Sequence, residues 1–474
     1  MNLPLSLSTP PRPPQENRRP YFAVYLLLAF LTAVVYAPLR HAGFADTTVV
    51  DNALHLQGTL WDGLPWMITG GVGSPLGWVS HWMDLHLHGL DPTGHHLTSL
   101  AVHLLNTILL FGLLWRVFSS LLPAAIGAGL FAVHPVNLDA VAWIAGRRYL
   151  LSLFFWLILM RGYISWGVEK RSRAYLCMAA SAVLGSLSDP LVFIAAPVVL
   201  LFFDFWPLKR WRAGVKGAKN AGSFLFARIR EKAALWAICA VLPVVLWAVG
   251  SPAAGGTAAA EEGMTAVAAT LTAPAVLFSA FFHLPNPASL AASAPPALQA
   301  GAALLLLCAM SAAVAVAGRR CPALLPGWAW FLTTALVEAA PVASCAEQTL
   351  RPWAYLPAAG LALLAAAVFS AAGGVAKKRG IAVAALGIGV VLLVAYGAAA
   401  KLERWRRSCL PDPVLSCYLA LDREVSEDAD SGWNGRGSMP SALIPRTKKR
   451  SSLRKLKNTV TKAKEASTIS SLFP

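Results

Sequence analysis

Residues able to do chemistry gather in four short segments that separate long apolar runs. These segments are residues 40–96, residues 134–149, the corner at Asp189 and residues 341–353. Carboxylates in such positions could remove a proton from a hydroxyl group, and neighbouring cations could hold a phosphate. Together with an apolar groove, these groups could move a group from a lipid-linked phosphate to a hydroxyl.

Two adjacent arginines, Arg147 and Arg148, are the first candidates for binding phosphate. A guanidinium group offers a fork of donors that fits phosphate oxygens. An equally good interpretation makes both side chains interfacial anchors that reach from an apolar helix to the membrane surface. His134 and Asp139 precede them, and a carboxylate close to the membrane is by default a candidate for function. We therefore predict that these four residues bind substrate.

The first segment adds a group of polar residues made of His81, Asp84, His95 and His96. They could contact substrate or hold a divalent metal, but their spacing lacks the pattern of zinc sites. A structural hydrogen-bond network is the favoured interpretation. The seven cysteines occur singly, without CxxC or metal-type spacing. We therefore assign no residue as a metal ligand and predict no certain cofactor, with a divalent metal as an alternative.

The elements that position these residues must be transmembrane helices. The chain has 474 residues, of which 57% are hydrophobic and 13% charged, too little polar surface for a water-soluble globule of this size. Long unbroken apolar runs favour helices over the alternating strands of a membrane barrel. The predicted fold class is all-α, as a polytopic integral membrane protein.

Apolar stretches close to the ~20 residues of a membrane span predict about eleven transmembrane helices. They lie at 21–39, 97–115, 120–134, 150–167, 174–187, 190–205, 233–250, 298–317, 323–340, 354–372 and 380–400. A further apolar stretch, 264–290, is broken by three prolines and predicts an interfacial or re-entrant helix.

Basic residues indicate the orientation, because loops rich in Lys and Arg stay cytoplasmic. Such loops occur at 169–173, 209–232, 318–320 and 377–379. The first loop, 40–96, contains only Arg40 and is predicted to be extracytoplasmic. The net charge of +17 lies mostly in basic loops and the tail, so we predict no nucleic-acid partner.

The chain divides into four predicted parts. Residues 1–20 form a cytoplasmic lead, and residues 21–400 form the transmembrane domain. Residues 401–428 are a short polar extension, and residues 429–474 form a basic tail that is too poor in apolar residues to fold.

Motifs along the chain resemble one family of membrane enzymes. The most specific are PLGWVSH (75–81), GHHLTSLAVHLLN (94–106) and HPVNLDAVAWIAGR (134–147), and weaker ones continue in order to about residue 422. Together they resemble the O-mannosyltransferase-like family, in which a GT-C membrane domain is joined to tetratricopeptide repeats. The resemblance implies a GT-C-like bundle, with residues 401–428 as a remnant of the first repeat.

The resemblance also implies a function. It implies an inverting transfer of mannose or another hexose from a polyprenyl phosphate to a protein or glycan acceptor at the extracytoplasmic face. The expected location is the bacterial cytoplasmic membrane, with membrane lipid as a partner. Asp46 becomes the best candidate for the general base, with capping of the next helix as the alternative, and Arg351 lies one position from the family's arginine.

This chain differs from the family at positions where the family has residues that could take part in catalysis. Phe44 and Ala45 stand where an Asp–Asp pair is expected, and Gly146 replaces a glutamate. Asp189 replaces a lysine, and the shorter Asp139 replaces a glutamate. A non-catalytic membrane scaffold or lipid-binding protein that retains the fold is therefore the alternative function. A transporter is less expected, since no paired inverted halves are visible.

Overall fold

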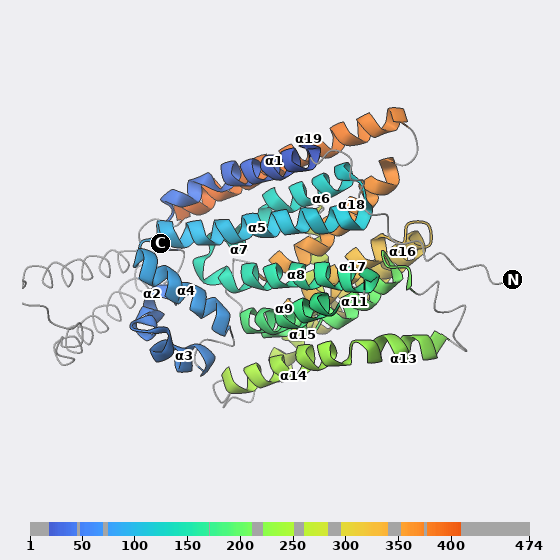
Figure 1. The fold of residues 1–474 in the computed structure, drawn as a ribbon. Coiled ribbons are helices and arrows are strands. Elements are labelled where there is room, and N and C mark those ends of the chain that lie inside the picture. The colour runs from blue at the N-terminus through green and yellow to red at the C-terminus, as the bar shows by residue number, and fades with distance from the viewer. Residues whose placement is uncertain are drawn as a thin grey trace, which may run out of the picture. The chain divides into compact units, whose positions relative to one another are not determined.

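The computed structural model describes residues 19–44, 48–69, 74–169, 171–210, 221–250, 260–282, 295–339, 352–373 and 377–408. Every regular element within these ranges is a helix, which confirms the predicted all-α class (Figure 1). Two predicted site residues, Asp46 and Arg351, lie outside the described residues. So do residues 1–18 of the lead, most of the polar extension and the whole basic tail.

The first half of the chain forms a long helical array with short helices in its first loop. Its helices are α1 (Arg19–Tyr36), η1 (Ala37–His41), α2 (Thr48–Asn52), η2 (Ala53–Leu56), α3 (Leu60–Thr69), α4 (Pro75–His88), α5 (Pro92–Phe118), α6 (Leu121–Val133), α7 (Pro135–Ala142), η3 (Ile144–Gly146), α8 (Arg147–Glu169), α9 (Ser172–Ser188), α10 (Pro190–Phe193) and α11 (Ala196–Phe205). Prolines open α4, α5, α7 and α10, where the missing N–H would have no helical partner.

The second half adds longer, Ala-rich helices. They are α13 (Ala221–Glu231), α14 (Ala233–Gly250), α15 (Ala260–Phe281), α16 (Pro296–Gly318), α17 (Leu324–Ala339), η5 (Pro352–Ala354), α18 (Tyr355–Gly373) and α19 (Lys377–Ser408). The predicted break at 264–290 begins as a continuous helix, since α15 runs through Pro274 to Phe281. The rest of that stretch lies outside the described residues, so its re-entrant character stays a prediction.

Six described helices are long and apolar enough to cross a membrane, or seven if the bent pair α6 and α7 forms one span. The chain is therefore an integral membrane protein, but the predicted count of eleven is not confirmed. Helices occur at the other predicted positions, yet several are too short. The 16 residues of α17 extend about 24 Å at 1.5 Å per residue, against a hydrocarbon thickness of about 30 Å.

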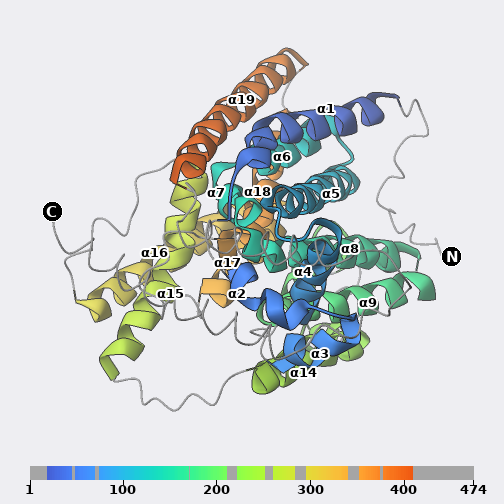
Figure 2. The ribbon, with the colours of Figure 1, turned by 90° about the vertical axis from the view of Figure 1, so that its left-hand side faces the viewer.

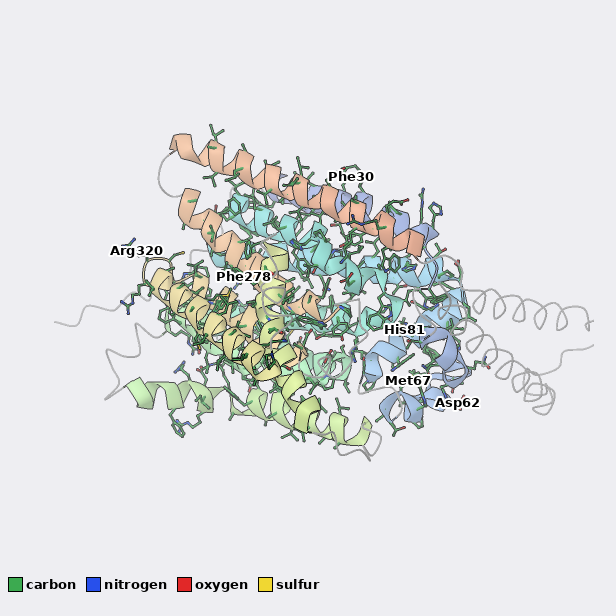
Figure 3. All side chains as sticks on the ribbon, turned by 180° about the vertical axis from the view of Figure 1, so that it is seen from behind. Phe30, Asp62, Met67, His81, Phe278 and Arg320 are labelled. Carbon is green, nitrogen blue, oxygen red and sulfur yellow. The ribbon has the colours of Figure 1, made fainter. Side chains whose placement is uncertain are left out.

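Apolar side chains on the outer helices face away from the bundle. Phe30 of α1 is 68% exposed, Leu305 of α16 is 74% exposed and Leu393 of α19 is 68% exposed (Figure 3 labels Phe30). In water such a surface would be unfavourable, whereas lipid tails solvate it. The inner helices differ, because Phe278 of α15 packs against Trp328 and Phe331 of α17.

The helix array has two ends of different character. At one end, called here the first-loop end, lie α2 to α4 and α7 (Figures 1 and 2). Along the chain η1 precedes α2 and η3 follows α7, and Asp189 lies beside Arg148 at the start of α8. The last residues of α5, α8, α11, α16 and α18 lie at the other end, called here the basic end. Figure 3 shows the separation, with Arg320 far from His81 and Asp62. The described residues of all four predicted basic loops are at the basic end.

Short helices of the first loop are fixed to the bundle at specific points. Leu56, Met67 and Trp78 form a small apolar cluster that joins α3 to α4. The Ser74 hydroxyl donates a 2.6 Å hydrogen bond to the carbonyl of Ser188, which anchors the start of α4 at the end of α9. The first loop therefore covers the helix ends that carry the predicted site residues.

Candidate functional site

A buried ion-pair network joins the first loop to the bundle. Asp84 of α4 pairs with Arg147, the first residue of α8, and both side chains are almost fully buried. Arg147 also donates to the carbonyl oxygen of His95 at 2.7 Å and to the hydroxyl of Ser80 at 3.2 Å. The other Asp84 oxygen accepts a 2.8 Å hydrogen bond from Thr98 of α5. Three helices from separate parts of the chain thus meet at one carboxylate.

Two histidines complete this network. His81, Asp84 and His95 each offer a ligand atom, and these atoms lie within 4.8 Å of one another. His95 Nδ1 is 3.4 Å from Asp84 Oδ2, and His81 Nδ1 has no hydrogen-bond partner among the residues described. Two imidazoles and a carboxylate suit zinc by type. A metal ion would nevertheless have to share Asp84 with the guanidinium of Arg147, so the arrangement fits the expected hydrogen-bond network better.

The surroundings of His81 favour its uncharged form. Burial lowers the pKa of His81 well below its usual value, and the nearby charges of Arg147 and His95 lower it further. A neutral imidazole beside a guanidinium avoids repulsion between two buried cations. His81 therefore packs in this network as an uncharged side chain.

His96 has a different partner from His95 and acts on the first loop. Its Nε2 lies 3.1 Å from the carbonyl oxygen of Gly43, just before the segment that contains Asp46. The imidazole is buried and its ring lies 6.1 Å from that of Trp405 on α19. His96 thus holds the backbone that leads into the predicted catalytic stretch.

A second cluster forms around Arg148, which lies outside the Asp84 network. Arg148 Nη2 donates a 2.6 Å hydrogen bond to the Tyr149 hydroxyl, and Arg148 Nε lies 4.0 Å from Asp189 Oδ2. The Arg148 side chain is 32% exposed, whereas that of Asp189 is 9% exposed. Gly77 of α4 packs beside Arg148, and a Cβ there would overlap the Ser74 hydroxyl at 2.5 Å.

Glu338, near the end of α17, belongs to the same cluster. It interacts electrostatically with Arg148 and Asp189, and it is only 4% exposed. Neither of its carboxylate oxygens has a hydrogen-bond partner within the described ranges of the chain. A buried carboxylate without a partner is costly, so it needs an explanation. The cluster of Arg148, Tyr149, Asp189 and Glu338, called here the Arg148 cluster, combines a partly exposed cation with two carboxylates.

Sequence reasoning named Arg148 and the Asp189 corner but missed Glu338 and Tyr149. A signal for Glu338 was present, because it is the only ionisable residue within the apolar run FLTTALVEAAP. Carboxylates in such runs are functional candidates by default.

A third cluster involves Asp139 and His134 near α7. Lys401 Nζ of α19 donates a 2.7 Å hydrogen bond to Asp139 Oδ1 and a 3.0 Å bond to the carbonyl oxygen of Pro135. His134 Nδ1 accepts from the N–H of Val136, and its Nε2 lies 2.9 Å from the carbonyl oxygen of Phe281. Both predicted residues therefore connect α7 to later helices, and Lys401 was not predicted.

The predicted site residues thus divide among separate clusters. The structure brings His81, Asp84, His95 and Arg147 together, while His96 holds the loop and Arg148 joins Asp189 and Glu338. His134 and Asp139 lie at the contacts of α7 with α15 and α19. Asp46 and Arg351 lie outside the described residues, so their convergence with these groups stays a prediction.

Comparison with known proteins gives partial matches of one kind. The chain is 34% identical to the protein O-mannosyl-transferase Tmtc1 of Drosophila melanogaster over 114 residues, which are 23% of this chain and 13% of that protein. It is 27% identical to Tmtc2 of the same organism over 198 residues, which are 38% of this chain and 21% of that protein. With TMTC1 of Mus musculus it shares 34% identity over 90 residues, 19% of this chain and 10% of that protein.

No protein-family model matches the chain, and no solved structure matches it. The chain matches only a minor part of each relative's length. These relatives come from animals, so they give no support to the expected bacterial membrane. The matches agree with the resemblance seen in the motifs and support a glycosyltransferase-like role for this membrane protein.

Proposed function

We propose that this protein is a membrane glycosyltransferase of the GT-C type, which transfers a hexose, such as mannose, from a polyprenyl phosphate to a hydroxyl acceptor. The acceptor belongs to a protein or glycan at the extracytoplasmic or luminal face. The observation that carries the proposal is the sequence similarity to proteins named O-mannosyl-transferases, which extends over as many as 198 residues. The polar clusters at the first-loop end support it.

The chemistry requires three balanced changes. The acceptor oxygen forms a bond to the anomeric carbon of the sugar while the bond from that carbon to the phosphate oxygen breaks. The phosphate keeps the electron pair of the broken bond, and a carboxylate accepts the acceptor's proton. A cation beside the phosphate stabilises the charge that develops on it.

Residues of the Arg148 cluster match two of these roles by type. Arg148 is a partly exposed guanidinium at the first-loop end, where it can face a phosphate. Asp46 remains the first candidate for the base because of its place in the family's catalytic stretch. Glu338 is the second candidate, since it is the carboxylate in the Arg148 cluster whose oxygens have no hydrogen-bond partner in the part of the chain that the structure describes.

Two other carboxylates favour a second candidate function, a non-catalytic scaffold that binds lipid and retains the fold. Asp84 and Asp139 are both held in ion pairs, by Arg147 and by Lys401. Each of these carboxylates thus contacts a cation of the chain itself rather than an acceptor hydroxyl. If Asp46 and Glu338 also take no part in transfer, the chain keeps the GT-C-like fold but does not catalyse glycosyl transfer.

The test is a transfer assay with the purified full chain and polyprenyl-phosphate hexoses. We expect transfer by the wild type, and a ~10²- to 10⁴-fold lower rate for Asp46→Ala if Asp46 is the base. Arg148→Gln should lower the rate as well, because the leaving phosphate loses its cation. Asp62→Asn is the matched control, since Asp62 is an exposed first-loop carboxylate outside the clusters.

The outcomes separate the alternatives. A wild-type rate in Asp46→Ala with a lost rate in Glu338→Gln would move the base to Glu338. Normal folding without transfer from any polyprenyl-phosphate hexose would reject the enzyme and favour the scaffold.

A further inference from the structure

Two arginines at the basic end have no acidic partner among the residues that the structure describes. Arg116 lies in the last turn of α5, and Arg161 lies on α8. No hydrogen bond or ion pair joins either side chain to any part of the chain that the structure describes. Two side chains act on Arg161 electrostatically, Tyr25 first and Arg116 second, and the like charge of Arg116 repels it. Two cations at the membrane are costly unless an anion pairs with them, and here that anion must come from outside the described chain.

Gly112 of α5 makes room for the inner arginine. A side chain at position 112 would overlap the guanidinium of Arg161, which therefore lies directly against the backbone of α5. Gly112 and Arg116 are four residues apart, so they share one face of the helix, with Arg116 one turn closer to the membrane surface. The two guanidinium groups therefore lie one after the other along the same face of α5.

Aromatic side chains of α1 pack beside these two arginines. The Tyr25 hydroxyl lies 3.1 Å from the position that a Cβ of Gly112 would occupy, and its ring is 4.8 Å from that of Phe111. One turn earlier on α1, the Tyr21 ring lies 4.2 Å from the ring of Trp115. Tyrosine and tryptophan gather where membrane proteins meet lipid headgroups.

The depth of the two arginines fits a headgroup. Arg116 is two residues from the end of α5, and Arg161 lies about 12 Å from the end of α8 at 1.5 Å per residue. A long arginine side chain can extend from that depth toward the interface. The basic loops at this end predict that it faces the cytoplasmic leaflet, where anionic lipids are concentrated.

We infer that Arg116, Arg161 and the Tyr25 hydroxyl form a binding site for the phosphate of an anionic phospholipid between α1, α5 and α8. The two guanidinium groups balance the phosphate charge, and the tyrosine hydroxyl donates to a phosphate oxygen. The acyl chains lie along the apolar outer face of α1, where Leu26 and Phe30 are exposed. This site lies at the end opposite the Arg148 cluster and is independent of glycosyl transfer.

The test follows thermal unfolding of the full chain in detergent micelles that contain increasing amounts of phosphatidylglycerol or phosphatidylcholine. We expect phosphatidylglycerol to raise the melting temperature with saturation, and phosphatidylcholine to have a smaller effect. Arg161→Gln and Arg116→Gln should each raise the half-saturating amount of phosphatidylglycerol about fivefold. Inorganic phosphate should not replace the lipid, because it lacks the acyl chains.

Arg173→Gln is the matched control. Arg173 is exposed near the start of α9 at the same end, and its substitution removes the same charge. It should leave the half-saturating amount unchanged. An equal loss in this control would reveal general charge attraction and overturn the site. An unchanged lipid response in both Arg116→Gln and Arg161→Gln, or a full response to inorganic phosphate, would also overturn it. If Arg161→Gln does not fold, the exposed Arg116 still decides the question.

Discussion

Asp84 and Arg147 show how a single residue pair can fix the first loop on the bundle. Both charges are buried, and Arg147 is surrounded by acceptors from α4 and α5. Removing one partner of a buried ion pair leaves the other charge without compensation, whereas removing both does not. The pair therefore belongs to the structure of the site, and its contribution can be measured by substitution.

Asp84→Asn is expected to destabilise the protein by about 3–5 kcal/mol, because it leaves the Arg147 guanidinium buried without a counter-charge. The double variant Asp84→Leu, Arg147→Met should be less destabilised than Asp84→Asn alone. Denaturation in detergent measures both, with the exposed Asp62→Asn as a control. A double variant that is less stable than Asp84→Asn would mean that losing the hydrogen bonds of Arg147 costs more stability than leaving its charge without a partner.

His81 predicts a pH dependence of stability. Its pKa in the folded protein is lowered, so the unfolded chain binds more protons below about pH 6.5. Stability from this group is complete above that pH and decreases by up to ~1.4 kcal/mol per unit as the pH falls toward the folded pKa. We expect the melting temperature to depend less on pH between 5 and 6.5 in His81→Asn than in the wild type.

The exposed His41 supplies the control for this titration. His41→Asn should keep the wild-type dependence on pH. If His81→Asn also keeps it, other groups cause the loss of stability in acid.

At the scale of elements, α17 and α18 cross at two glycines. A Cβ on Gly360 would lie 2.6 Å from the backbone nitrogen of Phe331, and a Cβ on Gly327 would lie 2.9 Å from that of Leu364. Small residues let helices approach closely in a membrane, where no hydrophobic force between helices exists. The helices after residue 290 are rich in Ala and Gly, and this crossing is one place where that composition allows close approach.

Gly360→Ala should therefore destabilise the protein by about 1–3 kcal/mol, because the added methyl group meets backbone that cannot rotate away. Gly301→Ala is the matched control, since nothing lies within 4 Å of a Cβ there. That control should be neutral or stabilising by up to ~1 kcal/mol through helix propensity. Equal effects of the two substitutions on the detergent melting temperature would contradict the close crossing.

At the scale of the whole membrane domain, the two ends of the array should face opposite sides of the membrane. The first loop, 40–96, has Arg40 as its one basic residue, and the described parts of all four predicted cytoplasmic loops lie at the basic end. The end of α19 departs from this pattern, because it brings Lys401, Arg404 and Arg406 to the first-loop end. A cysteine introduced at Leu60 of α3 should be labelled by an impermeant reagent in intact cells or sealed vesicles that expose the extracytoplasmic face. The native Cys321 at the basic end should react only after permeabilisation.

The labelling uses a background in which the other cysteines are replaced by serine, because Cys177 and Cys308 are also exposed. Labelling of position 60 and Cys321 from the same side would contradict the predicted topology. Neither result depends on whether the protein transfers a sugar.

Properties that depend on local composition could be predicted from the sequence by itself. Apolar runs dictate membrane helices because lipid leaves no backbone group unpaired, so the all-α class and the approximate helix positions followed. Motifs such as HPVNLDAVAWIAGR pointed to the same family as the partial matches with known proteins. The number of spans did not follow, because helices shielded by their neighbours can be shorter than the membrane is thick.

Only the tertiary structure decided which charges meet. Asp139 and Lys401 are 262 positions apart in the chain, and no spacing rule connects them. Arg147 and Arg148 are neighbours in sequence, yet adjacent residues on a helix point about 100° apart. One therefore enters the Asp84 network and the other faces Asp189 and Glu338. Composition fixes where helices form, but side-chain partners depend on how those helices pack, and that packing is determined by contacts across the whole chain.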